Sequence, residues 1–451
     1  MFHSTNHKSP EVNFNEAILQ GQASDNGLFM LNNIPQINKE LLTSFKEYSF
    51  REVAFEVLNH IINGYIPDNI LKDIVYHALN FEIPIKEFGS KNYICFLDRG
   101  PTCSFKDVGA RILARILEYI LKIEEKDIII LTATSGDTGG AVAQAFYKKK
   151  RIQVIVLFPE NEITNLQRKQ MTTLGENITA IGINGKFDDC QYIVKKAFAD
   201  KTLKGLNLTS ANSINFGRLL PQSIYYFWSH SQVTESTNES ILYSVPSGNF
   251  GNLTGGLIAN RMGLNIKKFI AAVNENDEFP RFLKTGNYTK VEPSKECISN
   301  AMNVGHPSNL ARIFDLYGGQ IDENGMIVKN PDLNAIRNDI VSFSISDYRT
   351  KQTIINFYEQ YNSILDPHGA VGWAALQKYR KYYPEYNSIK AICFETADPA
   401  KFPEEISPIL QIKLKIPLSL KKIQTKKEIR LSIEINDYHD FKAFLQKKYI
   451  E

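Results

Sequence analysis

The 451-residue sequence has few cysteines, no long hydrophobic run and little net charge. Its five cysteines are odd in number and widely scattered, without a CxxC pair or a Cys/His cluster of metal-ligand spacing. We therefore expect reduced thiols in a cytoplasmic protein. No apolar run approaches the length of a membrane span, and the polar first residues lack the hydrophobic core of a signal peptide. The formal net charge of +3 favours neither a nucleic acid nor a membrane surface as a partner.

The composition is that of an ordinary globular protein, with 43% hydrophobic and 22% charged residues. The chain is long enough for two or three domains. We expect a mainly helical N-terminal unit over residues 1–90, because the segment 50–63 is strongly amphipathic with helical spacing. A smaller α/β domain that begins with a reactive lysine is expected over 91–240. A larger α/β domain with a phosphate-binding loop and the C-terminal segment is expected over 241–451.

From residue 126 onwards, short buried strands alternate with helices. Apolar runs such as DIIILTA (127–133) and RIQVIVLFP (151–159) predict strands, and amphipathic segments follow them. This alternation predicts a largely parallel sheet with helices on both faces, in which ligands bind beyond the carboxyl ends of the strands. Residues 286–330 show no period that places them. Further along, we expect a helix near 333–345 and a terminal strand over the alternating run at 429–435.

A lysine lies where a Gly-Pro loop enters an amphipathic helix, in the stretch GPTCSFKDVGARILARIL (100–117). Apolar residues at positions i, i+1, i+4 and i+5 from Ile112 share one face of this helix, which fixes the position of Lys106. A lysine in a dry pocket loses part of its preference for the charged form, and its free amine can form a Schiff base with an aldehyde. On this stretch alone, a solvated lysine at the start of a helix is the better interpretation.

Two Gly-rich loops follow predicted strands and have the composition of small-ligand sites. Glycines let the backbone approach a ligand closely, and the helices that follow present free N–H groups. The loop TATSGDTGG (132–140) adds hydroxyl donors and suits a carboxylate. The loop PSGNFGNLTGG (246–256) is neither GxGxxG nor the phosphate loop of nucleotide hydrolases, yet its small residues at a helix start suit a phosphate.

Two further polar loops are less distinctive when taken alone. Asn212, Ser213 and Arg218 in SANSINFGR suit a second phosphate, to which the arginine brings charge and a fork of donors. Thr396 in ETADPAKF ends a predicted strand, where its hydroxyl suits a ring nitrogen or caps the next helix. Ser and Asn are common in turns. One loop-held lysine, two phosphate loops and one carboxylate loop together fit a pyridoxal phosphate enzyme that acts on a phosphorylated amino acid.

The motifs GPTCSFKD, LTATSGDTGGAVAQAF, LTSANSIN, VPSGNFGN and TADPAKF occur here in the order and at about the spacing found in threonine synthases. From about residue 10 to about residue 415, the chain resembles the long bacterial and fungal branch of that family, including its N-terminal extension. The resemblance implies an α/β fold of the tryptophan-synthase-β type, fold type II of the pyridoxal phosphate enzymes. This fold has two open, twisted, mostly parallel sheets flanked by helices. The implied reaction converts O-phospho-L-homoserine and water into L-threonine and phosphate.

The resemblance also implies roles for individual residues. Lys106 matches the lysine that binds the cofactor covalently and acts as the catalytic base, and Thr396 matches the residue that faces the pyridine nitrogen. Asp398 is a small departure from the family pattern, and His368 in DPHGAVGW matches a family segment without an assigned role. The remaining matches are Ser247, Gly248, Asn249, Phe250, Gly251 and Asn252 around the cofactor phosphate, Thr134, Ser135, Asp137 and Thr138 around the substrate carboxylate, and Asn212, Ser213 and Arg218 around the substrate phosphate.

Other functions stay open on the sequence. A phospho-lyase of the same fold would use the same residues and release 2-oxobutyrate, whereas a serine or threonine dehydratase would not need Arg218. A cofactor-binding homologue without turnover would be expected to have lost the lysine or the phosphate loop, and both are present. We expect a small-molecule substrate, no nucleic-acid or membrane partner, no metal, and a monomer or homodimer.

Overall fold

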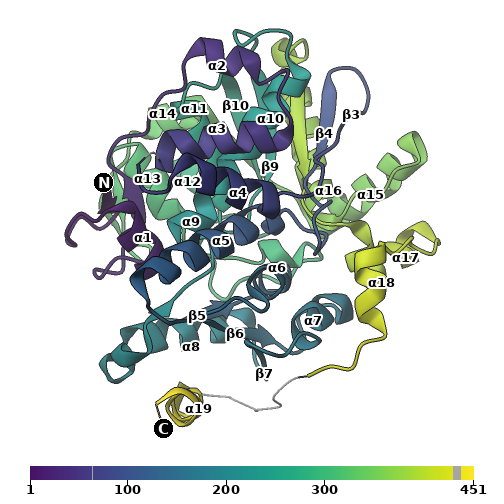
Figure 1. Ribbon diagram of the computed structural model, residues 1–451. Helices are drawn as coiled ribbons and strands as arrows, with labels where there is room; N and C mark the ends of the chain where they lie inside the picture. Colours follow the sequence, from purple (N-terminus) through teal and green to yellow (C-terminus); the bar gives the residue numbers. More distant parts are fainter. Residues whose placement is uncertain (63, 430–437, 451) are drawn as a thin grey trace.

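The computed structural model describes residues 1–62, 64–429 and 438–450. Its framework is two mainly parallel β-sheets, one in the upper and one in the lower part of the view in Figure 1. Within these residues, the larger sheet has six strands, in the order β13 (Ile340–Ser344), β10 (Ile266–Val273), β9 (Ile241–Pro246), β14 (Ala391–Glu395), β4 (Asn92–Phe96) and β3 (Ile85–Glu87). The smaller has four, in the order β7 (Ile178–Ile183), β6 (Ile152–Pro159), β5 (Ile128–Ala133) and β8 (Leu208–Thr209). Neighbouring strands pair in parallel, except that β3 and β4 are antiparallel. The predicted α/β architecture with two open parallel sheets is confirmed.

Helices cover the sheets and form most of the N-terminal region. The N-terminal elements are β1 (Phe2–Ser4), α1 (Phe14–Gln20), β2 (Phe29–Leu31), α2 (Lys39–Ser44), α3 (Phe50–Ile62) and α4 (Asp68–Ala78). Around the smaller sheet lie α5 (Lys106–Glu124), α6 (Asp137–Phe146), α7 (Asn165–Thr172), α8 (Phe187–Ala199) and α19 (Tyr438–Tyr449). The other helices are α9 (Phe216–Leu219), α10 (Ile224–Val233), α11 (Gly251–Arg261), α12 (Glu278–Thr285), α13 (Leu310–Leu316), α14 (Leu333–Asp339), α15 (Asp347–Tyr361), α16 (Pro367–Tyr382), α17 (Pro403–Leu410) and α18 (Leu418–Gln424).

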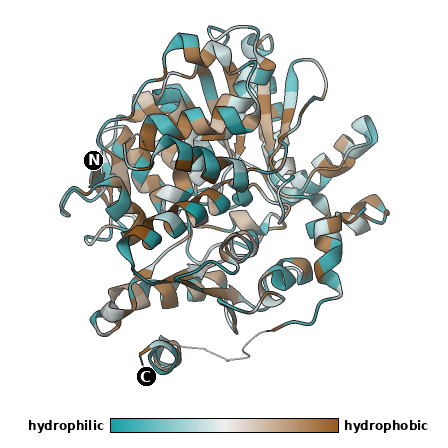
Figure 2. Cartoon of the chain, viewed as in Figure 1, coloured by the Kyte–Doolittle hydropathy of each residue, from teal (hydrophilic) through white to brown (hydrophobic). Residues whose placement is uncertain are grey.

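Side chains of each sheet alternate between two hydrophobic cores, because successive residues of a strand point to opposite faces. In β5, Ile128 and Ile130 join the core that contains apolar residues of α5 and α6, whereas Ile129 and Leu131 join a separate core with α8 and α19. Burial on both faces accounts for the uninterrupted apolar runs of these strands. Figure 2 shows the same pattern, with hydrophobic strands between helices whose outer faces are hydrophilic.

The N-terminal region packs against the helices of the larger sheet. Asn13 and Glu16 start α1 with a capping box, in which each side chain accepts a hydrogen bond from the backbone N–H of the other. The apolar face of α3, which includes Val53 and Val57, packs against α10 and shares the core of both sheets. The N-terminal region is therefore mainly helical, as predicted, with a short antiparallel pair of strands, β1 and β2. β3, which also lies within residues 1–90, belongs to the larger sheet, and the existence of a separate N-terminal unit stays a prediction.

The expected helix near 333–345 is only half right. It ends at Asp339, and residues 340–344 form strand β13, which pairs in parallel with β10 along the edge of the larger sheet. Pairing and burial against β10 outweigh the local preference of this short segment. The terminal strand expected at 429–435 lies outside the described residues, apart from Ile429.

One strand assigned to the 91–240 domain belongs elsewhere. β4, which leads into the Lys106 loop, pairs with β14 in the larger sheet. The division of the chain near residues 90 and 240 otherwise stays a prediction. No helix in the described part of the chain is both long and apolar enough to cross a membrane.

Candidate active site

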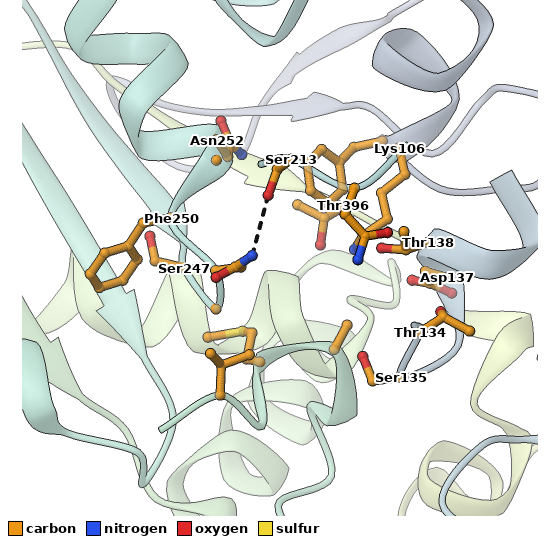
Figure 3. Close-up of a pocket in the computed structure, with 18 of the residues that line it drawn as sticks. Lys106, Thr134, Ser135, Asp137, Thr138, Ser213, Ser247, Phe250, Asn252 and Thr396 are labelled. Carbon is orange, nitrogen blue, oxygen red and sulfur yellow. Dashed lines mark hydrogen bonds between the residues drawn. The ribbon is translucent and has the colours of Figure 1, made fainter. Parts of the chain in front are cut away.

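The loops at the carboxyl ends of β5, β9 and β14 meet at one pocket, together with the loop after β8 (Figure 3). This is the edge at which parallel α/β sheets bind ligands. Every residue assigned to the site from the sequence lines the pocket: Lys106, Thr134, Ser135, Asp137, Thr138, Asn212, Ser213, Arg218, Ser247, Gly248, Asn249, Phe250, Gly251, Asn252 and Thr396. The structure brings the predicted residues together, and their individual roles stay predictions.

Lys106 is the first residue of α5, and hydrogen bonds on both sides hold it in place. The Phe105 N–H donates to the carbonyl oxygen of Thr396 at 2.8 Å, which ties the lysine loop to the end of β14. The buried carboxylate of Asp107 accepts hydrogen bonds from the backbone N–H and the hydroxyl of Thr102 at 2.8 and 2.9 Å. The Lys106 side chain therefore leaves a rigid loop and enters the pocket (Figure 3).

The surroundings of the Lys106 amine favour its neutral form. Burial lowers the pKa of Lys106 to about 8; the negative charge of Asp137 opposes this effect, and the positive charges of Arg218 and Lys401 add to it. At about pH 7.5 roughly a quarter of such amines are neutral, against about one in a thousand for a solvated lysine. A neutral amine is the form that attacks an aldehyde or accepts a proton.

The loop at the start of α6 keeps its shape through the side chain of Thr134. The Thr134 hydroxyl accepts hydrogen bonds from the N–H groups of Gly136 and Gly139 at 2.9 and 2.8 Å and keeps its own O–H as a donor. Gly136 has a φ of +130°, and a Cβ there would lie 2.5 Å from the amide of Gln167. The conformation therefore requires glycine. Ser135 and Thr138 line the pocket beside it.

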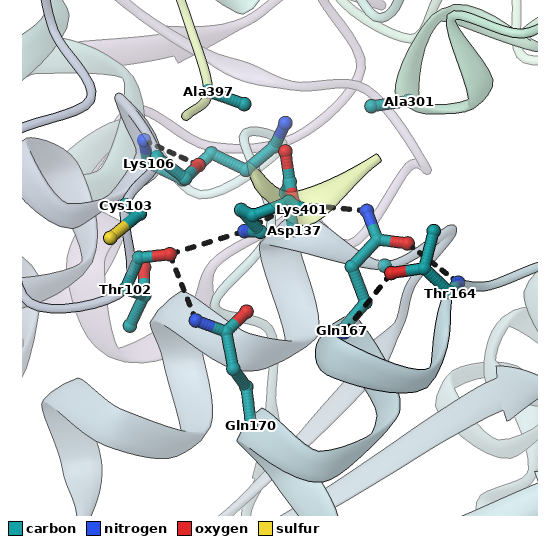
Figure 4. A network of polar contacts seen from close by, with 12 residues as sticks. Thr102, Cys103, Lys106, Asp137, Thr164, Gln167, Gln170, Ala301, Ala397 and Lys401 are labelled. Atoms are coloured by element: carbon teal, nitrogen blue, oxygen red, sulfur yellow. Dashed lines mark hydrogen bonds and ion pairs between the residues drawn. The ribbon is translucent and has the colours of Figure 1, made fainter. Parts of the chain in front are cut away.

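Behind this loop, a buried ion pair joins Asp137 to Lys401 (Figure 4). The Lys401 ammonium lies 2.5 Å from Oδ1 of Asp137 and also donates to the carbonyl oxygen of Thr102 at 3.1 Å. Gln167 donates a hydrogen bond to the same carboxylate oxygen at 3.0 Å. Burial alone would raise the pKa of Asp137, but the charges of Lys401 and Lys106 bring that pKa well below its usual range. Asp137 is therefore an anion whose charge is balanced mainly by Lys401.

The sequence motif TADPAKF contains Lys401, but the motif did not predict a role for this lysine. Its partner lies on α6, far away in the sequence, and no local pattern predicts this pairing. The only sequence feature that could have indicated a buried role for Lys401 is its place in a short motif directly after a buried strand.

The loop 247–252 connects β9 to the N-terminus of α11, where unpaired backbone N–H groups suit an anion. Phe250 is left-handed, with a φ of +57°. At Gly248, a Cβ would lie 2.8 Å from the carbonyl oxygen of Ala301. At Gly248 the backbone of the loop therefore approaches the Ala301 segment more closely than a side chain would allow.

Asn252 is anchored from behind by two tyrosines. The hydroxyl groups of Tyr225 and Tyr226 donate to its Oδ1 at 2.9 and 2.8 Å, while the buried Nδ2 has no hydrogen-bond partner among the described residues. An orphan donor, a glycine cradle and a helix N-terminus lie in the same pocket as the Lys106 amine. These features fit the phosphate and the aldehyde of pyridoxal phosphate.

Arg218 is a buried cation without a charge partner. Its side chain is 3% exposed, and its Nε makes no hydrogen bond to any described residue. Nor does the described part of the chain offer its guanidinium an ion pair. Burial lowers the pKa of Arg218 to about 10, with the charge of Asp107 opposing. An isolated buried charge is costly unless it is paired, so this pocket calls for an anionic ligand.

The region 286–330, which the sequence did not place, contributes to the pocket in two ways. Ala301, Met302 and Val304 line it directly. In α13, Arg312 donates to the carbonyl oxygen of Ser213 at 2.8 Å, and Asn309 donates to the Ser213 hydroxyl at 2.9 Å. These two residues position a predicted substrate residue, and sequence reasoning missed both.

His368 also lines the pocket and positions one of its walls. The Ala301 N–H donates to His368 Nε2 at 3.1 Å, so the ring proton is on Nδ1, which lies 2.5 Å from Oδ1 of Asp366. Asp366 in turn caps α16 by accepting hydrogen bonds from backbone N–H groups. His368 therefore joins the start of α16 to the segment that contacts Gly248.

Three family models match the chain: "Threonine synthase N terminus" over residues 1–79, "Pyridoxal-phosphate dependent enzyme" over 80–393 and "Threonine synthase, C-terminal" over 369–445. A threonine synthase from Haemophilus influenzae is 38% identical over 442 residues, covering 98% of each chain. One from Saccharomyces cerevisiae is 34% identical, covering 99% of this chain and 98% of its own.

Solved structures agree over nearly the whole length. The Escherichia coli threonine synthase has a TM-score of 0.89 at 34% identity and covers 99% of both chains. A threonine synthase from Brucella melitensis with bound pyridoxal phosphate has a TM-score of 0.90 at 30% identity, covering 99% of this chain and 98% of its own. A serine racemase from Dictyostelium discoideum, at 18% identity and a TM-score of 0.50, shares the fold alone.

Proposed function

The chain belongs to the threonine synthase family of pyridoxal phosphate-dependent lyases. From this membership, we propose which pocket residues bind the cofactor, bind the substrate and transfer protons. The reaction converts O-phospho-L-homoserine and water into L-threonine and phosphate. We assign the cofactor phosphate to the 247–252 loop, the substrate carboxylate to the 134–138 loop and the substrate phosphate to Arg218 with Asn212 and Ser213. Lys106 carries the cofactor and moves protons.

Pyridoxal phosphate, when bound, supplies an electron-poor ring that takes up the charge left when a proton leaves the substrate α-carbon. Lys106 would accept that proton at Nζ, and its lowered pKa makes available the neutral amine that can do so. Thr396 lines the pocket, and its neutral hydroxyl would hydrogen-bond the ring nitrogen of the bound cofactor without protonating it. The negative charge of Asp137 is paired mainly with the Lys401 ammonium. This pairing leaves the Lys106 amine free for proton transfer.

The buried guanidinium of Arg218, which has no ion-pair partner among the described residues, is the observation that carries the assignment of a phosphorylated substrate. The phosphate of O-phospho-L-homoserine would supply the missing counter-charge and accept bidentate hydrogen bonds. Arg218 would also stabilise the charge that develops on the phosphate as it leaves the γ-carbon. For the atoms to balance, a proton also leaves the β-carbon as phosphate departs. The oxygen of water then adds at the β-carbon, and the γ-carbon takes up a proton to become the methyl group of threonine. Serine and threonine, the substrates of a dehydratase, have no second anionic group beyond the α-carboxylate to pair with this cation.

The state of the cysteines supports a location in the cytoplasm. All five cysteines are free and buried, in keeping with a reducing compartment. We propose that the enzyme works there on a small-molecule substrate, without a nucleic-acid or membrane partner, as a monomer or homodimer.

Steady-state kinetics of Arg218→Met tests the substrate assignment. We expect kcat/KM for O-phospho-L-homoserine to fall by about 100-fold or more, while the absorbance of the lysine-bound cofactor stays unchanged. Arg115→Met, which removes a half-buried arginine of α5 outside the pocket, serves as the control and should behave like the parent. Unchanged kinetics in Arg218→Met would contradict the phosphate assignment. 2-Oxobutyrate as the main product of the parent would favour the phospho-lyase instead.

A further inference from the structure

Outside the pocket, two histidines and an aspartate from distant parts of the chain meet at the surface. His3 belongs to β1, His7 follows in the next turn, and Asp315 lies near the end of α13. His3 Nε2 is 3.0 Å from Oδ1 and 3.1 Å from Oδ2 of Asp315, and His7 Nε2 is 3.3 Å from the same Oδ1. The ligand atoms of all three residues lie within 4.8 Å of one another. Asp315 is 312 positions from His3, so sequence spacing gave no sign of this cluster.

The orientation of His3 is fixed by a second partner. Its Nδ1 lies 3.1 Å from Oδ1 of Asn32, an atom that only accepts hydrogen bonds. The ring proton is therefore on Nδ1, and a neutral His3 points the lone pair of Nε2 at Asp315. Two acceptors at this separation repel each other unless a proton or a metal cation lies between them. A histidine that donates through one ring nitrogen and presents the other is the usual arrangement around a bound metal.

We propose that His3, His7 and Asp315 bind one divalent transition-metal ion of the zinc type. Two imidazoles and one carboxylate are ligands that Zn²⁺ prefers, with water in the fourth position. Tetrahedral coordination with bonds of about 2.0–2.1 Å places neighbouring ligand atoms about 3.3 Å apart, close to the 3.0 and 3.3 Å between the carboxylate and the two rings. Mg²⁺ and Ca²⁺ prefer oxygen-only sites and are poor candidates.

The ion joins the first strand of the chain to α13. Three residues before Asp315, Arg312 of the same helix donates to the backbone of Ser213 and Ile214. Binding therefore stabilises the N-terminal strand on the body of the enzyme, and the folded state gains stability because the unfolded chain lacks the site. None of the three ligands lines the pocket, so the ion is structural and distinct from the catalytic reaction.

A proton is the competing occupant of the space between His3 and Asp315. When no metal ion is bound, the hydrogen bond to Asp315 raises the pKa of His3. If the cluster serves only as an ion pair, zinc will not bind there. Calorimetric titration of the untagged holoenzyme with Zn²⁺ alone, at slightly alkaline pH, separates these two cases.

We expect one Zn²⁺ per chain in the parent, and affinity weakened about tenfold or more in His7→Asn, in Asp315→Asn and in Asn32→Ala. The His7 side chain is 50% exposed, so its substitution leaves the fold intact. His77→Asn is the matched control, because His77 forms an exposed pair with Asp73 at 3.1 Å and has no third ligand among the described residues. Zn²⁺ should raise the thermal unfolding midpoint of the parent and of His77→Asn, and not that of His7→Asn. Absence of stoichiometric binding, or equal binding in His7→Asn and the parent, would overturn the proposal.

Discussion

Replacing Lys401 by methionine would leave the buried carboxylate of Asp137 without its main counter-charge. The Lys401 side chain is fully buried, and the Asp137 side chain is 3% exposed. At that exposure, little water reaches the carboxylate to replace the missing ammonium. Removing one partner of a buried ion pair costs about 3–5 kcal/mol of unfolding free energy, because the remaining charge stays desolvated.

The chain contains a matched control for this substitution. Lys149 and Glu118 lie at the same separation of 2.5 Å, but their side chains are 18% and 40% exposed. Water can solvate Glu118 when Lys149 is replaced by methionine, so the expected loss is about 0–1 kcal/mol. The difference between the two variants isolates the effect of burial, since both remove one lysine from a pair of equal length.

Urea denaturation of the holoenzyme at saturating cofactor measures both losses. We expect Lys401→Met to unfold at a clearly lower urea concentration than Lys149→Met. The double variant Lys401→Met/Asp137→Asn should recover most of the loss, because its buried site no longer holds a charge. Equal midpoints for the two single variants would refute the reasoning. So would a double variant that is less stable than Lys401→Met.

Two further predictions concern the cofactor. Burial lowers the pKa of Lys106 to about 8, and the neutral amine is the reactive form. The rate at which the apoenzyme attaches pyridoxal phosphate should therefore rise with pH and level off above about 8; a rate that keeps rising to pH about 10 would indicate a solvated amine. Gly248→Ala should weaken cofactor binding, because its Cβ would lie 2.8 Å from the carbonyl oxygen of Ala301, whereas Gly205→Ala meets nothing within 4 Å and should bind the cofactor like the parent. Equal affinities would contradict the proposed phosphate loop.

Local patterns predicted the parts of the molecule that depend on local sequence. Loops such as 134–138 and 247–252 are strand-to-helix turns, and their glycines and hydroxyls are needed where they stand. The sequence predicted that ligands bind beyond the carboxyl ends of the strands, and the four polar loops that follow strands do share one pocket there. The lysine at a helix start followed the same logic.

Local sequence patterns could not predict contacts between residues that are far apart in the chain. Three contacts join segments that are far apart in the chain: the Asp137–Lys401 ion pair, the hydrogen bond from Arg312 of α13 to Ser213, and the contact of His3 with Asp315. Strand β13 formed where a helix was expected, because its neighbour β10 decides its conformation. The segment around Ala301 has no regular period, so its place in the pocket wall became visible only in three dimensions.

Quantifying the products formed from O-phospho-L-homoserine by the parent and by Lys106→Ala tests the central claim most directly. We predict that the parent yields L-threonine and phosphate in equal amounts. Lys106→Ala should yield neither product and should lack the absorbance of a lysine-bound cofactor. L-Threonine formation that persists in Lys106→Ala, or 2-oxobutyrate in place of L-threonine in the parent, would contradict the account.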